Sequence, residues 1–260
     1  MSSLSKDILP LLSSSLTIFN LSKYDKDLEE EASFSLSYAS PREIRKVFNT
    51  IAKSFSRTRR RPWRYPLEIV NNHLEGPLAD LGCGNGRHTL LMAMMGFECI
   101  GLDISPELLK MAKELVKAFN IHDVTDFVEA DIRFLPFRDK AFRGIIFIAT
   151  LHHISPRKLR IHCLKEVRRV LKPNSKAVVT TWTKLKPSAM LKCLLFKLKN
   201  PRAEFGDVLI PWKLKSQKVL RFYHLYTQRE LEEDCFRAGL SILKSYRDYE
   251  NHVVVVSRSS

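Results

Sequence analysis

No long apolar segment occurs in this sequence. The longest uncharged apolar runs, such as residues 144–151 and 253–256, are far shorter than the ~18 residues that a membrane-spanning helix requires. The weakly apolar stretch 8–19 is broken by Pro10 and by three consecutive serines, and no cleavage-site pattern follows it. We therefore expect neither a transmembrane helix nor a secretory signal, and no membrane among the partners.

Cysteine is also scarce. The chain has five cysteines, which are odd in number and widely scattered, and no CxxC motif occurs. Such a set excludes a disulfide framework and a structural zinc site. It is typical of a reducing compartment, so we expect a cytoplasmic protein that holds no metal.

Acidic residues are greatly outnumbered by basic ones. The sequence has 43 Lys and Arg against 28 Asp and Glu, which gives a formal net charge of +15. Ten basic residues lie within 184–221, and five arginines lie within 57–64, interleaved with Trp63 and Tyr65. Guanidinium groups bind phosphates and aromatic rings stack on unpaired bases. A nucleic-acid surface is favoured over a solvated face that serves solubility alone.

The hydrophobic pattern from Gly76 onward alternates between strands and helices. The predicted strands are 77–81, 97–102, 126–130, 142–149 and 176–182, followed by two closing strands at 240–246 and 252–257. Helical patterns follow the first, second and fourth of these strands, and the fourth is mostly apolar, as a strand covered on both faces should be. This order predicts an α/β fold: a Rossmann-like, seven-stranded, mostly parallel sheet with helices on both faces.

The remaining segments flank or interrupt this pattern. Residues 1–39 show little periodicity, and we expect a poorly ordered arm or a short helical preface there. One domain then spans 40–260. Its first helix starts at Ser40 with a capping box completed by Glu43. The basic stretch 183–226 is a predicted insertion before the last helix.

The most informative segment is a glycine loop between the first strand and the next helix. Its glycines alternate along the chain as Gly82, Gly84 and Gly86, directly after Asp80. In a doubly wound sheet such a turn lies where ligands bind. Asp103 ends the next strand, where a carboxylate can hold a ribose, and Asp131 with Ile132 ends the third. Although the glycines could form only a tight structural turn, the combination favours a nucleoside site.

Four segments together resemble the class I S-adenosylmethionine-dependent methyltransferases: DLGCGNG, GLDIS, EADIRFLPF and the helix ending in VLKP. The resemblance implies that Asp80 and the glycine loop face the methionine part of S-adenosyl-L-methionine. It also implies that Asp103 holds the ribose hydroxyls and that Asp131 and Ile132 contact the adenine. Ile104 and Ala149 complete the implied cofactor site.

Segments outside this core are similar to the tRNA wobble-uridine carboxymethyl methyltransferases, including the methyltransferase domain of the animal AlkB-homologue fusion. The similarity lies in VFNTIAKSFSRTRRRPW, FIATLHHIS and GDVLIPWKLKSQKVLRFYHLYTQRELEE. Members esterify the acid of 5-carboxymethyluridine at position 34 of the anticodon. Arg143 and the pair Asn174 and Ser175 depart from the family pattern, but away from the expected substrate pocket.

The implied chemistry needs no general base. A carboxylic acid with a pKa of about 4 is already an anion at neutral pH, so the enzyme has to position it in line with the methyl group. The predicted catalytic residues are Arg59, which holds the carboxylate or a phosphate, and His153, which follows the fourth strand. The predicted substrate-binding residues are His152, Trp63, Arg64, Trp212, Tyr223 and His224.

Structural roles remain open for some of these residues. One of the two histidines could instead cap the loop at Ser155. Trp63 and Trp212 could pack the first helix against the insertion.

The resemblance also implies partners. One is the tRNA anticodon loop, and the other is a small zinc-binding activator protein that covers an apolar edge of the sheet. The weak third strand near Phe127, with Phe134 and Phe137, could supply that edge. The alternative functions are a small-molecule methyltransferase of quinone or sterol type, suggested by the LPF-x-D-x-x-F pattern, and an RNA-binding scaffold without turnover.

Overall fold

The computed structural model describes residues 37–69, 76–183, 187–215 and 217–258. Most of the predicted N-terminal arm, together with Lys184 and Lys186 of the basic insertion, lies outside these residues. Within the described ranges, no helix is both long enough and apolar enough to cross a bilayer. All five cysteines are buried and none forms a disulfide, as predicted.

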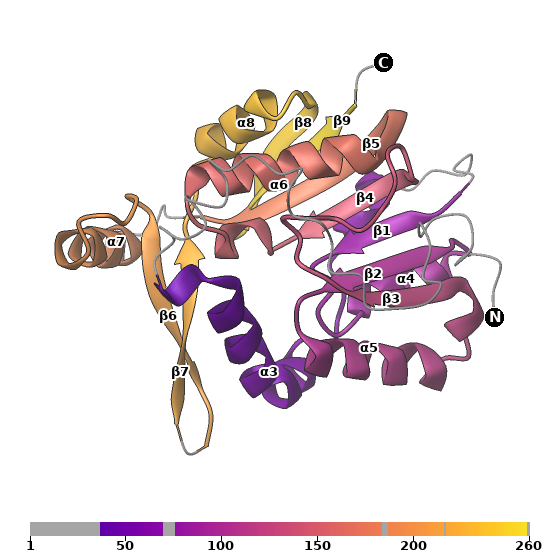
Figure 1. Cartoon of the computed structure of the whole chain (residues 1–260), viewed down its shortest axis with the longest axis horizontal. Helices are drawn as coiled ribbons and strands as arrows, with labels where there is room; N and C mark the ends of the chain where they lie inside the picture. Colours follow the sequence, from indigo (N-terminus) through magenta and orange to yellow (C-terminus); the bar gives the residue numbers. More distant parts are fainter. Residues whose placement is uncertain (1–36, 70–75, 184–186, 216, 259–260) are drawn as a thin grey trace, which may run out of the picture.

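A seven-stranded sheet organises the chain (Figure 1). Its strand order is β3-β2-β1-β4-β5-β9-β8. The first five strands run parallel, and β9 is antiparallel to both β5 and β8. The strands are β1 (Leu78–Leu81), β2 (Cys99–Asp103), β3 (Thr125–Glu129), β4 (Phe142–Ile148), β5 (Leu171–Trp182), β8 (Ser241–Asp248) and β9 (Asn251–Ser257). The predicted mostly parallel sheet is confirmed.

Helices cover both faces of the sheet, as predicted. On one face the buried side chains of α6 (Arg157–Val170) and α8 (Gln228–Arg237) pack against the strands. On the other face α4 (Arg87–Met94) and the short helix η3 (Tyr65–Glu68) supply the core. The helix α5 (Pro106–Ala118) lies against β2 and β3. The order of the strands reverses between β1 and β4, which is where parallel sheets of this kind bind ligands.

The insertion folds as a separate layer beside this switch point. Its strands β6 (Asp207–Lys213) and β7 (Lys218–His224) form an antiparallel hairpin, and α7 (Pro187–Lys199) packs on it through Cys193. The first helix, α3 (Pro41–Thr58), lies between the hairpin and α5 (Figure 1). Packing of Ile44 on Phe222 joins α3 to β7. The two segments outside the sheet therefore meet above the carboxyl ends of the strands.

Two predicted details differ from the structure. Strand β5 begins at Leu171 rather than at 176, because Leu171 pairs with Phe142 and a bulge carries the strand past Pro173. At Ser40 the hydroxyl oxygen accepts the N–H of Glu43, but the N–H of Ser40 donates to Ser37, so the predicted box is only half formed. The box between Thr227 and Glu230 at the start of α8 is complete.

Candidate active site

A cavity of about 570 Å³ lies over the carboxyl ends of the parallel strands. The glycine loop, the ends of β2, β3 and β4, the end of α3 and the insertion strand β7 all contribute to its wall. Of the predicted site residues, the cavity is lined by Arg59, Trp63, Gly82, Gly84, Asp103, Ile104, Asp131, Ile132, Ala149, His152, His153 and Tyr223. The structure therefore brings together residues from distant parts of the sequence.

The glycine loop wraps tightly against its neighbours. Gly82, Gly84 and Gly86 have φ angles of 74°, 55° and 75°, in the left-handed region that only glycine adopts at low cost. A Cβ atom on Gly82 would lie 2.2 Å from Oγ1 of Thr150, in the loop after β4. The N–H of Gly82 donates to the carbonyl of Leu102, 2.7 Å away. The turn is thus structurally required and also exposes backbone to the cavity.

Asp103 closes β2 at the cavity wall. One carboxylate oxygen accepts the N–H of Gly84 at 2.8 Å, and the other accepts the N–H of Ser105 at 2.9 Å. Burial raises the pKa of Asp103 to about 6, although these backbone bonds oppose the rise. Ile104 and Ile132 provide apolar wall on either side. This combination of a fixed acceptor and apolar surface suits a nucleoside.

Three predicted cofactor residues already have partners within the protein. Asp80 is buried behind the loop, where Thr89 donates to it at 2.7 Å and burial raises its pKa to about 7. Gly86 also lies behind the wall, because it packs against Ala112 of α5. Asp131 lines the cavity, and the side chain of Arg133 donates to both of its oxygens.

Both predicted histidines are buried in an aromatic cluster at the cavity wall. Nδ1 of His153 donates to the carbonyl of Phe222 on β7, 2.7 Å away, and Nδ1 of His152 accepts the N–H of Trp182 at 3.1 Å. Tyr223 packs on both rings and stacks on Trp182. Both Nδ1 atoms therefore bond to residues other than Ser155, whereas in the alternative one histidine caps the loop at Ser155.

The histidines carry no charge at neutral pH. Burial lowers the pKa of His153 to about 3 and holds that of His152 well below its usual value. Because the partners of Nδ1 fix the tautomers, His152 presents Nε2–H as a donor and His153 presents Nε2 as an acceptor. The two residues can therefore shape the cavity and form hydrogen bonds, but they do not supply positive charge.

Arginines from the end of α3 dominate one side of the cavity. Arg57, Arg59, Arg60 and Arg61 all line it. The backbone carbonyl of Arg59 accepts the Asn85 side-chain amide at 3.0 Å, which ties α3 to the glycine loop. Arg133 also lines the cavity, paired with Asp131. The remaining lining arginines, Arg87 and Arg221, were not among the predicted site residues either. The sequence held a signal for each, since Arg87 directly follows the glycine loop and Arg221 shares one face of its strand with Tyr223.

The predicted aromatic residues divide into two groups. Trp63 lines the cavity, and its backbone N–H donates to Nε2 of His88 at 3.0 Å. Trp212 lies outside the cavity lining and donates to Ser54 of α3, so it packs the first helix against the insertion, as the alternative stated. Arg64 is exposed and also outside the lining, because it immediately precedes η3 and that turn carries it away.

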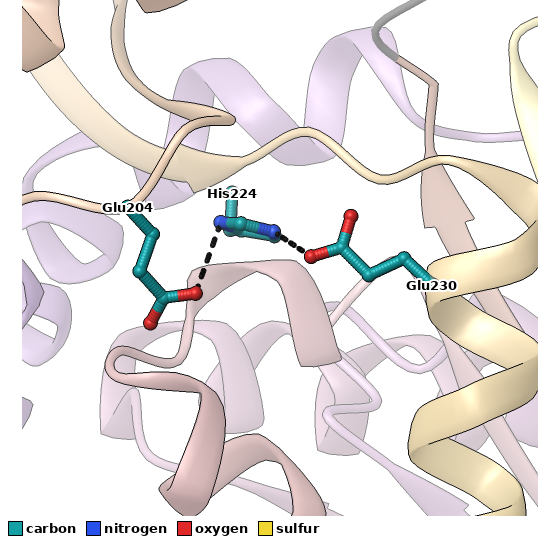
Figure 2. Close-up of side chains that lie close together, drawn as sticks. All are labelled: Glu204, His224 and Glu230. Carbon is teal, nitrogen blue, oxygen red and sulfur yellow. Dashed lines mark hydrogen bonds and ion pairs between the residues drawn. The ribbon is translucent and has the colours of Figure 1, made fainter.

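His224 does not reach the cavity. Its Nδ1 lies 2.7 Å from Asp207 and its Nε2 lies 2.7 Å from Glu230, with Glu204 on the other side of the ring (Figure 2). Glu204, His224 and Glu230 are close enough to hold a metal ion. However, the buried Arg160 guanidinium lies 2.6 Å from Glu204 and 3.9 Å from Glu230 and already supplies positive charge. This cluster ties the insertion to α6 and α8.

Strand order, glycine loop and the acid ending β2 define the class: a Rossmann-like methyltransferase of class I. The profile of the family described as "Methyltransferase domain" matches residues 79–179. A methyltransferase of Encephalitozoon cuniculi, whose name states no substrate, is 31% identical over 223 residues, which cover 84% of this chain and 96% of the relative. The chain belongs to the S-adenosylmethionine-dependent methyltransferases.

Two further relatives carry a more specific name, tRNA (carboxymethyluridine(34)-5-O)-methyltransferase. The Saccharomyces cerevisiae protein is 26% identical over 273 residues, covering 83% of this chain and 95% of that protein. The Xenopus tropicalis alkbh8 protein is 30% identical over 264 residues, but this chain spans only 40% of its length.

Solved structures share the fold. A Methanosarcina mazei S-adenosylmethionine-dependent methyltransferase superposes with a TM-score of 0.66 at 19% identity, covering 76% of this chain and 99% of that one. A Haloferax volcanii methyltransferase in complex with the Trm112 methyltransferase activator superposes with a TM-score of 0.59 at 16% identity, covering 82% and 98%. At these identities the likeness concerns the fold.

Proposed function

We propose that this enzyme methylates the carboxylate of 5-carboxymethyluridine at position 34 of tRNA. The observation that carries the proposal is the composition of the single cavity described above. It joins a nucleoside-type subsite at Asp103 to a strongly basic subsite, with seven arginines and two aspartates in its wall. Such a wall suits an anionic substrate and the phosphates that flank it. The names of the Saccharomyces and Xenopus relatives support the same substrate.

The residues present fit S-adenosyl-L-methionine as cofactor. Asp103 would accept the ribose hydroxyls, Ile104 and Ile132 would pack on the adenine, and the glycine loop would pass beneath the methionine part. When bound, the cofactor supplies a methyl group attached to a positively charged sulfur. The neutral thioether that remains after transfer is a good leaving group. Asp80 would act indirectly, by holding Thr89 of α4 behind the loop.

The protein's part in the reaction is positioning. A carboxylate is already ionised at neutral pH, so no residue has to remove a proton from it. The neutral, buried His152 and His153 agree with this chemistry, because they form one wall without acting as a base. Arg59 would hold the carboxylate or a neighbouring phosphate, and Tyr223 and Trp63 would contact the base.

Nucleoside mass spectrometry of tRNA from cells that lack this gene tests the proposal. We expect 5-carboxymethyluridine to accumulate and its methyl ester to disappear. A small-molecule methyltransferase would leave tRNA nucleosides unchanged and show no affinity for tRNA, whereas the proposed enzyme should bind tRNA with an affinity that falls steeply with salt. Retention of the cofactor residues Asp103, Gly82 and Gly84 argues against a scaffold without turnover.

Replacing Arg59 with alanine should lower kcat/KM for methyl transfer to tRNA about 10–100-fold, because a hydrogen bond to a charged group contributes ~1.5–3 kcal/mol. Cofactor affinity should be preserved. Isotope-labelled methyl transfer and calorimetry measure the two quantities. Arg42→Ala, which removes an exposed arginine from the opposite end of α3, is the control. Unchanged activity would remove Arg59 from the proposed subsite.

Cofactor affinity should depend on pH through Asp103. The ionised carboxylate is the form that accepts ribose hydroxyls, and its pKa is about 6, so affinity should fall ~10-fold between pH 7.5 and pH 5. Calorimetry with S-adenosylhomocysteine measures this. In Asp103→Asn the pH dependence of cofactor affinity should flatten. Asp80 is unchanged in this variant, so any difference between the two proteins is due to Asp103. An equally steep profile in both proteins would assign the titration elsewhere.

We also propose that a small activator protein binds the edge of the sheet at β3. Strand β3 is an edge strand, and Phe127 and Phe134 beside it are only half-buried. Phe137 is not available, because it is buried in the core against Phe142. The Haloferax volcanii neighbour, which is described in complex with such an activator, supports this proposal. An isolated chain that is soluble, monomeric and fully active would refute it.

A further inference from the structure

Arg221 on β7 is a buried cation that has no acidic partner among the described residues. The residue is 6% exposed, and none of the ion pairs in the described part of the chain includes it. Arg160, the other buried arginine of this region, has three carboxylates within 4.0 Å. Since burying a cation without an anion is unfavourable, Arg221 has the character of one half of an ion pair.

The free edge of this guanidinium matches a carboxylate. Nη1 donates to the Tyr223 hydroxyl at 2.5 Å, while the buried Nε–H has no acceptor among the described residues. Trp212 and Tyr223 hold the group in place, with ring centroids 4.7 and 5.0 Å from its central carbon. The Nε and Nη2 groups form the edge that donates two parallel hydrogen bonds to a carboxylate.

A second cation adjoins Arg221 at the same wall. The Arg59 guanidinium lies over the same Trp212 ring, with its central carbon 5.5 Å from the centroid. Burial lowers the pKa of Arg221, and the nearby Arg59 lowers it further. Two like charges at one cavity wall repel each other until an anion lies between them.

Arg221 lies on the side of the cavity where we expect the substrate. Its partner Tyr223 packs on His152 and His153, which follow β4 beyond the glycine loop. Of the other two buried arginines in the described cavity wall, Arg133 is paired with Asp131, whereas Arg87 opens α4 directly after the glycine loop, on the cofactor side. Arg87 therefore suits an anionic group of the cofactor, and Arg221 suits one of the substrate.

We propose that Arg221, assisted by Arg59, binds the substrate carboxylate that becomes methylated. This inference rests on the proposed carboxyl methylation. One carboxylate oxygen forms a bond to the methyl carbon as the carbon–sulfur bond breaks, its electron pair goes to the sulfur, and no proton is transferred. The product is a neutral ester, which the guanidinium holds more weakly than the anion, so the same contact favours product release. It also rejects the corresponding amide, whose NH₂ group faces N–H donors.

The first test compares Arg221→Gln and Arg221→Lys with wild type in the full chain. We expect kcat/KM on tRNA bearing 5-carboxymethyluridine to fall ~100-fold or more in Arg221→Gln and less in Arg221→Lys, which keeps the charge but loses the fork. The Kd values for S-adenosylhomocysteine and for tRNA that lacks the carboxymethyl group should stay within ~2-fold. Arg247→Gln, an exposed arginine of β8, is the control. Wild-type turnover in Arg221→Gln, or an equal loss of cofactor affinity, would overturn the proposal.

The second test does not depend on turnover with tRNA. The ¹H–¹⁵N signal of the Arg221 Nε–H is followed in the S-adenosylhomocysteine complex, with Arg221→Lys used to assign it. Free 5-carboxymethyluridine should shift this signal, whereas its amide, 5-carbamoylmethyluridine, should not. A shift without methylation of tRNA would contradict the proposed function but support this carboxylate site. If tRNA is methylated but the Arg221 signal does not shift, the proposed carboxylate site is overturned and the proposed function still stands.

Discussion

Asp103→Ala is expected to raise the Kd for S-adenosylhomocysteine at least ~100-fold while tRNA affinity stays within ~2-fold. The carboxylate is the fixed acceptor at the end of β2, and two hydrogen bonds from ribose hydroxyls to a charged group together account for ~3 kcal/mol or more. Calorimetry measures cofactor binding, and filter binding measures tRNA binding. The hydrogen bonds of Asp103 go to Gly84 and Ser105 rather than to Arg59 or the insertion, so the tRNA surface should be unaffected.

Controls separate this effect from damage to the loop. Asp103 also accepts the N–H groups of Gly84 and Ser105, so alanine leaves two donors unpaired. Asp103→Asn keeps the shape and one acceptor oxygen, and should still lose most of the affinity. Asp123→Ala removes a carboxylate that is 87% exposed and should change nothing. An equal loss of cofactor and tRNA affinity in Asp103→Ala would contradict the assignment of the site.

Arg160→Met is expected to lower the free energy of unfolding by ~3–5 kcal/mol, because it removes the cation from a buried cluster and leaves the acids unpaired. Arg160 is 0% exposed and lies within 4.0 Å of Glu204, Glu230 and Asp234. It thereby joins the insertion and α8 to α6. Urea unfolding followed by circular dichroism measures the loss.

The pH dependence gives this variant a signature. Burial alone would raise the pKa of Glu204, but Arg160 holds it below its usual value in the wild type. Without Arg160 the folded-state pKa rises above the unfolded one, so the variant should regain part of its stability as the pH falls toward 5. Arg229→Met, which breaks an exposed pair with Glu233 on α8, should leave unfolding nearly unchanged. A similar loss of stability in both variants would mean that the buried cluster contributes no more to stability than an exposed ion pair.

The fold could be predicted from local patterns because β1, β2 and β4 are largely apolar runs, each followed by its own helix. The glycine loop and Asp103 were identifiable for the same reason, since their spacing along the chain sets their position in the sheet. Strand β5 was predicted too short, because its first residue is placed by pairing with Phe142 across a bulge, which no local pattern records.

The substrate side was harder to predict because tertiary packing decides it. His224 resembles a base-contacting residue in sequence, yet Asp207 and Glu230 bind both of its ring nitrogens away from the cavity. Arg221 is one of many cations in the insertion, and only the docking of the hairpin on α3 buries it. Charge composition therefore indicated a basic surface but not which arginine would face the cavity.

The most direct test of the central claim is methyl transfer by the purified full chain, with and without a small zinc-binding activator, to tRNA bearing 5-carboxymethyluridine at position 34. Labelled S-adenosylmethionine and nucleoside mass spectrometry locate the methyl group. The account predicts label in the methyl ester of that nucleoside alone, released as methanol by mild alkali. Label on another nucleoside, an alkali-stable product, or no transfer under either condition would contradict it.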